Sequence, residues 1–218
     1  MTMNWFPFYL SLKVAVVATL INSLLGTGIA WNMARRQFRG KALIEALLVQ
    51  PLVMPPTVLG YYLLISFGRY SPLGDFLAET LGISLVFTWQ GAVLASSISS
   101  IPLFIMPARA AFEGIDRRLE QVARTLGQSP WGVFRTISLP LAWRGIVAGM
   151  VMTFARAMGE FGATLMLAGN IPGKTQTASI AIYDAVQSGD TTLANALVAL
   201  MTLLSIAALW FANRFLKR

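Results

Sequence analysis

The sequence contains no cysteine and no histidine. Without these side chains the chain cannot form a disulfide, a thiol nucleophile, a histidine acid–base pair or a zinc site of the usual kind. Charge is also scarce, because Asp, Glu, Lys and Arg make up 12% of the residues, about half the fraction found in ordinary soluble domains. The reactive groups that catalysis needs are therefore few, and we expect a protein that is not an enzyme and holds no metal.

Hydrophobic residues make up 56% of the chain, and its mean hydropathy is +0.65. A transmembrane helix needs about 20 mainly apolar residues. Five stretches meet this condition: residues 10–34, 46–67, 89–108, 141–168 and 193–212. The sequence thus predicts an all-α integral membrane protein with about five transmembrane helices, forming one domain over residues 1–218. We also expect a short helix near residues 73–81 and a first span that is retained, not cleaved as a signal.

The 17 basic residues outnumber the 9 acidic ones, and they gather beside alternate spans. The basic segments contain Arg35, Arg36, Arg39 and Lys41, then Arg109, Arg117, Arg118, Arg124, Arg135 and Arg144, and finally Arg214, Lys217 and Arg218, whereas the two remaining loops hold only Arg69 and Lys174. Lys and Arg concentrate on the cytoplasmic side of membrane proteins. We therefore expect the N-terminus outside and the C-terminus inside. The partners expected from this pattern are membrane lipids and not nucleic acid.

Residues 113–140 form a charged stretch between two spans. Leu119, Val122, Ala123 and Leu126 recur at the spacing of one helix face, and Arg117, Arg118, Glu120, Gln121, Arg124 and Thr125 fall on the other side. Gly127 is placed to end this helix with a left-handed residue, and Ser129 with Pro130 to begin another. We interpret the stretch as a docking element for a soluble partner. The alternatives are an amphipathic helix on the membrane surface and a DNA-binding helix-turn-helix, which the adjacent spans disfavour.

The same stretch resembles the cytoplasmic loop of permease subunits of bacterial ABC importers. That loop reads Glu-Ala-Ala, three residues, Gly, nine residues, Ile, one residue, Leu-Pro, and the matching positions here are Ala123, Gly127, Ile137, Leu139 and Pro140. Gln121 and Val122 depart from the pattern, although Glu120 stands one place earlier. Residues 40–42, 52–61, 159–164 and 169–175 look like the molybdate branch of the family.

The resemblance implies a type I-like permease of a bacterial inner membrane that imports molybdate as a homodimer. It implies two cytoplasmic ABC ATPase subunits that use ATP and Mg, an external oxyanion-binding protein, and no cofactor on this chain itself. The residues it places against the ATPase are Leu119, Glu120, Gln121, Val122, Ala123, Leu126, Gly127, Ile137, Leu139 and Pro140. The alternatives are a permease for tungstate or sulfate, or a secondary carrier.

Two charged residues, Arg156 and Glu160, lie within the fourth predicted span. A central Arg costs roughly 2.5–3.5 kcal/mol on insertion scales, and the i, i+4 spacing allows the two side chains to pair. The pair is either a neutralised structural element or part of an anion pathway. We favour the structural interpretation.

Other pathway candidates lie in the second and third spans. Pro51, Pro55 and Pro56 break backbone hydrogen bonds near Gln50 and Thr57, and broken helices often line transport routes. In the third span the hydroxyls of Ser96 and Ser100 suit either an oxyanion or a helix–helix hydrogen bond. These residues are candidates for the pathway or its gate.

Glycine patterns leave two further questions. Gly145 and Gly149 have the spacing of close helix packing, either within one subunit or between two, and Gly159 and Gly162 are candidates to extend that face. Residues 169–175 nearly spell a phosphate-binding loop, but the first glycine is one residue too late. We therefore expect an outer loop that meets the binding protein, not a nucleotide site.

Overall fold

The computed structural model describes residues 4–216, and every regular element in that range is a helix. The helices are α1 (Phe6–Arg35), α2 (Lys41–Val53), α3 (Pro56–Phe67), α4 (Pro72–Leu81), α5 (Trp89–Glu113), α6 (Arg117–Thr125), α7 (Pro130–Val133), the π-helix η1 (Phe134–Ser138), α8 (Leu139–Met158), α9 (Gly162–Ala168), α10 (Ala178–Ser188) and α11 (Thr191–Leu216). Lys217 and Arg218, which the orientation argument used, lie outside the described residues.

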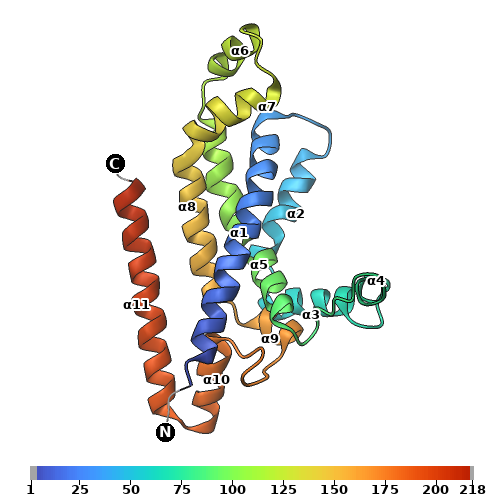
Figure 1. Cartoon of the computed structure of the whole chain (residues 1–218), viewed down its shortest axis with the longest axis vertical. Helices are drawn as coiled ribbons and strands as arrows, with labels where there is room; N and C mark the ends of the chain where they lie inside the picture. The colour runs from blue at the N-terminus through green and yellow to red at the C-terminus, as the bar shows by residue number, and fades with distance from the viewer. Residues whose placement is uncertain (1–3, 217–218) are drawn as a thin grey trace.

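Helices α1, α5 and α8 form the centre of the molecule and run along its long axis (Figure 1). Their shared core is built from small and aromatic side chains. Ala30, Phe104, Ala108 and Ala142 have no exposed surface in it. Lipid tails are as apolar as the helix side chains, so the hydrophobic effect does not drive helices together inside a membrane. They associate there largely through close van der Waals packing, which small residues permit.

The glycines of α8 illustrate this packing. A Cβ atom on Gly145 would lie 2.6 Å from the carbonyl oxygen of Pro107, and one on Gly149 would lie 2.8 Å from that of Phe104. Both glycines therefore face α5 of the same chain, which resolves the question in favour of packing within one subunit. Gly162 does not extend this face, since its neighbour is Pro56 of α3.

The segment predicted as the second span, residues 46–67, is sharply broken. Helices α2 and α3 meet at 112° around Met54 and Pro55. A residue before proline is pushed to extended backbone, and both Met54 (ψ 142°) and Pro55 (ψ 131°) precede a proline. Two consecutive extended residues turn the chain through a large angle. The bend is therefore much sharper than a proline kink within one continuous helix.

The segment predicted as the fourth span, residues 141–168, is also divided. Helix α8 ends at Met158, and α9 begins only at Gly162. The apolar run did not reveal this break, and the sequence analysis also missed α10, which connects the loop at residues 169–177 to α11. Helix α3 packs on α9 through Gly60, where a Cβ would lie 2.9 Å from the Cα of Ala163.

By length and hydropathy, four helices in the described range are able to span a membrane, or five if α2 and α3 count as one span. α11 stands largely apart from the other helices (Figure 1), with 11% of its most apolar window buried. Its apolar surface therefore faces lipid or another polypeptide.

Helix α6 lies at one end of the long axis, and the N-terminus lies at the other (Figure 1). Asp116 caps its start by accepting a hydrogen bond from the Arg118 N–H at 2.9 Å. At the end of α6, Gly127 has a left-handed backbone with φ +86°. The N–H of Gln128 donates a hydrogen bond to the carbonyl oxygen of Ala123 at 3.1 Å, and the N–H of Gly127 donates one to that of Arg124 at 3.0 Å. This pair of bonds is a Schellman motif.

Gly145→Ala is predicted to destabilise the fold, because the added methyl would meet a backbone oxygen of α5 that cannot swing away. Overpacking of this kind typically costs about 1–3 kcal/mol. Thermal unfolding of the purified protein in detergent should show a lower midpoint. Gly28→Ala is the matched control, since nothing lies within 4 Å of a Cβ at Gly28. Equal midpoints for the two variants would contradict this packing.

Candidate docking site and transport pathway

Glu120 points into the molecule and not outward. Its Oε1 atom accepts hydrogen bonds from Arg35 Nε at 3.0 Å and from Ser138 Oγ at 2.6 Å, and Arg35 Nη2 lies 2.8 Å away. The sequence pattern grouped Glu120 with the polar residues on the other side of the helix, and it did not reveal that this carboxylate is buried. Together with Ala123 it forms the buried face of α6, because this carboxylate finds both a charge partner and a hydroxyl there.

The contact of Glu120 connects three parts of the chain. Arg35 ends α1, Ser138 lies in η1 directly before α8, and Glu120 belongs to α6. An aromatic cluster lies beside these contacts. The ring centroid of Phe134 lies 5.1 Å from that of Trp31 in α1 and 5.2 Å from that of Trp131 in α7. We call this group of contacts the junction. It joins α6 to the end of α1 and to the segment that leads into α8.

The apolar face of α6 is exposed. Leu119, Val122 and Leu126 are 49%, 56% and 80% exposed, respectively. With Ile137, Pro140 and Leu141 they line a groove of about 560 Å³ at the end of the molecule. Exposed apolar side chains gathered in a groove are typical of an interaction surface. Most of the residues predicted to contact an ATPase therefore line this one groove. Glu120 does not line it and is buried on another side of α6.

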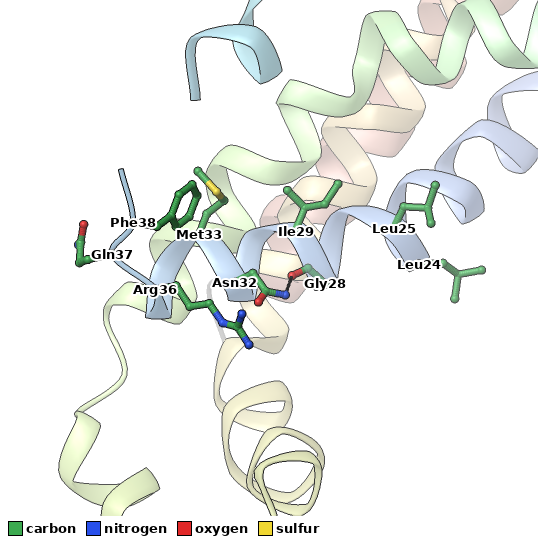
Figure 2. A pocket seen from close by; sticks show the side chains of 9 residues that line it. All are labelled: Leu24, Leu25, Gly28, Ile29, Asn32, Met33, Arg36, Gln37 and Phe38. Atoms are coloured by element: carbon green, nitrogen blue, oxygen red, sulfur yellow. Dashed lines mark hydrogen bonds between the residues drawn. The ribbon is translucent and has the colours of Figure 1, made fainter. Parts of the chain in front are cut away.

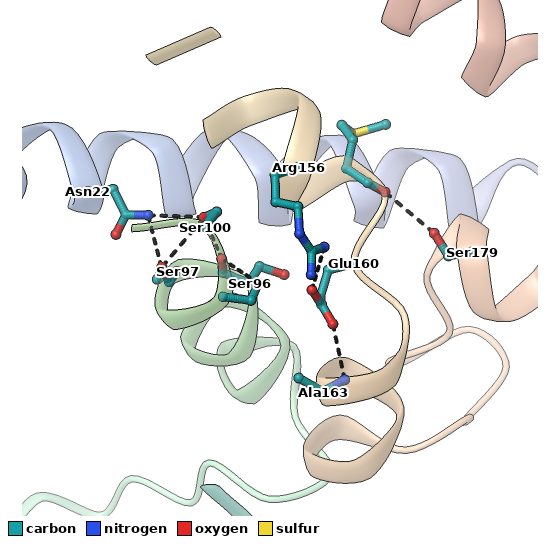
Figure 3. Close-up of polar contacts among 10 residues, drawn as sticks. Asn22, Ser96, Ser97, Ser100, Arg156, Glu160, Ala163 and Ser179 are labelled. Carbon is teal, nitrogen blue, oxygen red and sulfur yellow. Dashed lines mark hydrogen bonds and ion pairs between the residues drawn. The ribbon is translucent and has the colours of Figure 1, made fainter. Parts of the chain in front are cut away.

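Arg156 and Glu160 form an ion pair with 2.6 Å between Nη1 and Oε2. Glu160 is almost fully buried, and its Oε1 also accepts a hydrogen bond from the N–H of Ala163 at 3.0 Å (Figure 3). The carboxylate thus bridges the break between α8 and α9. Arg156 retains 27% side-chain exposure, so its guanidinium is neutralised but still reachable.

The serines of α5 are divided between two environments. Ser100 is buried against α1, where Asn22 donates hydrogen bonds to its Oγ at 3.1 Å and to Ser97 O at 3.0 Å (Figure 3). Ser100 therefore takes part in helix–helix packing. Ser96 Oγ is buried and has no hydrogen-bond partner within the described chain. The sequence argument missed Asn22, although an Asn in the middle of an apolar span is itself a signal.

Four of the candidates lie at or beside the bend between α2 and α3, and all four are exposed: Gln50, Pro55, Pro56 and Thr57. The bend brings Pro56 against Gly162, close in sequence to Glu160. These candidates therefore share the region of the two helix breaks, whereas Ser100 is engaged by Asn22 of α1. Their roles in a pathway remain predictions. Across residues 4–216 no group of acidic side chains is arranged to hold a metal ion.

A large open groove of about 890 Å³ runs along α1 (Figure 2). Leu24, Leu25 and Ile29 line its apolar part, and Arg36 and Phe38 lie at the end where α1 stops. The groove is a shallow outer surface of a membrane helix and not an enclosed site.

The loop after α9, residues 169–177, is held by polar contacts at the end opposite α6. Gln176 Nε2 donates to Asn170 Oδ1 at 2.9 Å and to Asp184 Oδ2 at 3.3 Å. Thr175, Gln176 and Thr177 are buried, whereas Lys174 is exposed. A phosphate-binding loop needs a strand before it, and here α9 takes that place.

Glu120→Ala is predicted to loosen the junction, because it leaves the Arg35 guanidinium buried without its partner. Removing one member of a buried ion pair typically costs about 3–5 kcal/mol. Limited proteolysis of membrane vesicles should then cut within residues 113–140 faster than in the unaltered protein. Glu113→Ala is the control, since the side chains of its pair with Arg109 are 27% and 44% exposed, against 11% and 9% for Arg35 and Glu120. Equal cleavage rates in both variants would rule out a supporting role for Glu120.

Glu160→Ala is predicted to lower the amount of assembled complex several-fold without changing anion preference. The substitution removes both the partner of Arg156 and the acceptor for the start of α9. Assembly is measured by size-exclusion chromatography, and preference by competition between anions in transport. Glu79→Ala on the exposed surface of α4 is the control. Normal assembly with altered preference would show that the pair acts in selection.

Comparison with known proteins places these features in a family. The model of the binding-protein-dependent transport system inner membrane component family matches residues 22–218. The molybdenum transport system permease protein ModB of Escherichia coli K12 is 45% identical over 215 residues, covering 96% of this chain and 94% of that protein. The chloroplastic sulfate permease 2 of Chlamydomonas reinhardtii is 35% identical, covering 94% of this chain and 55% of that protein.

The crystal structure of a bacterial ABC transporter that imports alginate resembles the fold with a TM-score of 0.77 at 15% identity, covering 100% of this chain and 80% of that chain. The predicted all-α fold and importer-permease architecture are confirmed. This chain belongs to the family of inner membrane components of binding-protein-dependent transport systems.

Proposed function

We propose that this chain is the membrane-spanning permease subunit of an ATP-driven importer that moves molybdate into the cell. The observation that carries the proposal is the exposed docking surface of α6, in a chain that aligns along nearly its whole length with a molybdenum permease. Identity to the molybdenum permease exceeds that to the sulfate permease by ten percentage points (45% against 35%). Molybdate is therefore favoured over sulfate.

Energy for transport comes from a separate ATPase dimer that uses ATP and Mg, and this chain has no catalytic role and binds no cofactor. The ATPase seats Leu119, Val122 and Leu126 in a cleft of its own. Burying these side chains yields about 25 cal/mol for each Å² of apolar surface removed from water. Docking is thus driven by the same apolar face that α6 leaves uncovered.

Motion of the ATPase reaches the membrane through the junction. Displacement of α6 pulls on Arg35 through Glu120 and on η1 through Ser138. Because α1 and α8 pack tightly on α5, the three helices follow as a unit. Packed interfaces switch between discrete arrangements and do not deform smoothly, so closure of the ATPase dimer alternates the opening of the permease.

The end that carries α6 faces the cytoplasm, and the N-terminus and the loop at residues 169–177 face outward. An oxyanion-binding protein docks on the outer end and delivers its ligand. Two copies of the permease enclose the pathway, and the exposed faces of α3 and α11 are available for that contact or for lipid. The helix breaks at Pro55–Pro56 and at Gly159–Phe161 lie beside the pathway, where Gln50 and Thr57 meet the passing dianion. The membrane is the bacterial inner membrane.

Two other functions remain distinguishable by experiment. A permease for tungstate or sulfate would share this geometry, because tetrahedral dianions differ little in charge and shape. A secondary carrier would move its cargo without any ATPase.

The decisive test uses the permease co-purified with the ATPase and reconstituted into liposomes with the binding protein. We expect molybdate-loaded binding protein to raise ATP turnover several-fold and to drive uptake. Sulfate in place of molybdate should give no stimulation. Stimulation by sulfate alone would reassign the substrate, and uptake in liposomes without ATPase would overturn the importer assignment.

A further inference from the structure

Helix α6 has a second exposed flank, which is basic. Arg117, Gln121 and Arg124 lie on the side of the helix opposite the apolar groove. Together with Arg35 and Glu120 they line a small polar pocket of about 170 Å³. Both flanks belong to the same short helix. A partner whose cleft encloses this helix therefore contacts the groove on one side and the pocket on the other.

The charges of the pocket do not cancel. Arg35 and Glu120 neutralise each other in the junction. Arg117 and Arg124 are exposed, and within residues 4–216 no acidic side chain lies in salt-bridge range of either one. Gln121, which stands where importer permeases carry Glu in the loop pattern, adds no negative charge. Two uncompensated guanidinium groups therefore border the pocket.

Membrane lipid does not explain these two arginines. Figure 1 shows α6 at the extreme end of the molecule, beyond α7 and beyond the ends of α1 and α8. The basic residues at the ends of the spans themselves, such as Arg36 and Lys41, are the ones placed to meet lipid headgroups. Arg117 and Arg124 face the solution, where only a soluble partner comes into contact with them.

We propose that the soluble partner seated on α6 inserts an Asp or Glu carboxylate between Arg117 and Arg124 while its apolar side chains fill the groove of Leu119, Val122 and Leu126. This inference rests on the proposed function, since the partner is the ATPase. A guanidinium matches a carboxylate with two parallel hydrogen bonds, and the charge-assisted bonds fix geometry as well as affinity. The apolar flank thus supplies the buried area, and the basic flank sets the orientation of α6 in the cleft.

Charge reversal tests the inference. Arg117→Glu and Arg124→Glu, alone and together, are each co-expressed with the ATPase, and the dissociation constant of the detergent-solubilised complex is measured at several salt concentrations. We expect each single variant to weaken binding at least 10-fold in low salt, and the salt dependence to diminish in the double variant. Arg135→Glu is the matched control, because Arg135 is exposed on η1 but lines neither the groove nor the pocket.

Crosslinking identifies the group in the pocket directly. Arg117→Lys and Arg124→Lys keep the charge and introduce an amine, which a carbodiimide joins to a nearby carboxylate as an amide. Mass spectrometry should find an ATPase Asp or Glu attached at these positions and none at Arg135→Lys. Reversal variants that bind normally, or crosslinks equal to those of the control, would overturn the inference.

The outcome separates this inference from the proposed function. Leu126→Asp disrupts the apolar contact and leaves Arg117 and Arg124 in place. If Leu126→Asp abolishes ATPase binding while the reversal variants bind normally, the carboxylate inference fails and the importer function stands. If neither Leu126→Asp nor charge reversal affects ATPase binding, the docking role of α6 fails as a whole.

Discussion

The buried carboxylate of Glu120 is the contact on which the rest of the structure depends. Through it a nine-residue helix, too short to be stable alone, is fixed to the end of α1 and to the segment that leads into α8. A buried carboxylate is tolerated only where its charge is paired and its oxygens are hydrogen-bonded; Arg35 and Ser138 meet both conditions. The exposed side of α6 is thereby free to present apolar and basic residues to a partner.

Behind this junction the membrane helices combine rigid packing with two defined breaks. Gly145 and Gly149 let α8 approach the α5 backbone closely, so α5 and α8 form a tightly packed pair. The breaks at Pro55 and at Glu160 lie farther along, where α3 crosses α9. Broken helices of this kind often line the transport routes of membrane transporters.

Local patterns predicted much of this architecture. Five apolar runs indicated the spans, and the spacing of Leu119, Val122 and Leu126 with Gly127 indicated the docking helix and its end. The same periodicity did not reveal that Glu120 is buried, because its partners come from other parts of the chain. Arg35 lies 85 residues from Glu120, and no local pattern reveals a contact at that separation. The break before α9 was missed because no proline marks it.

The absence of native cysteine allows the central claim, that α6 and the membrane helices move as one body, to be measured by site-directed spin labelling. Gln128→Cys next to α6 and Lys174→Cys in the opposite loop place labels at exposed positions at the two ends. Distances between equivalent labels in the two permeases of the assembled importer are then compared with and without ATP and loaded binding protein. We predict that the Gln128 distance shortens and that the Lys174 distance changes in the same step. A shift at Gln128 with no change at Lys174 would contradict the account.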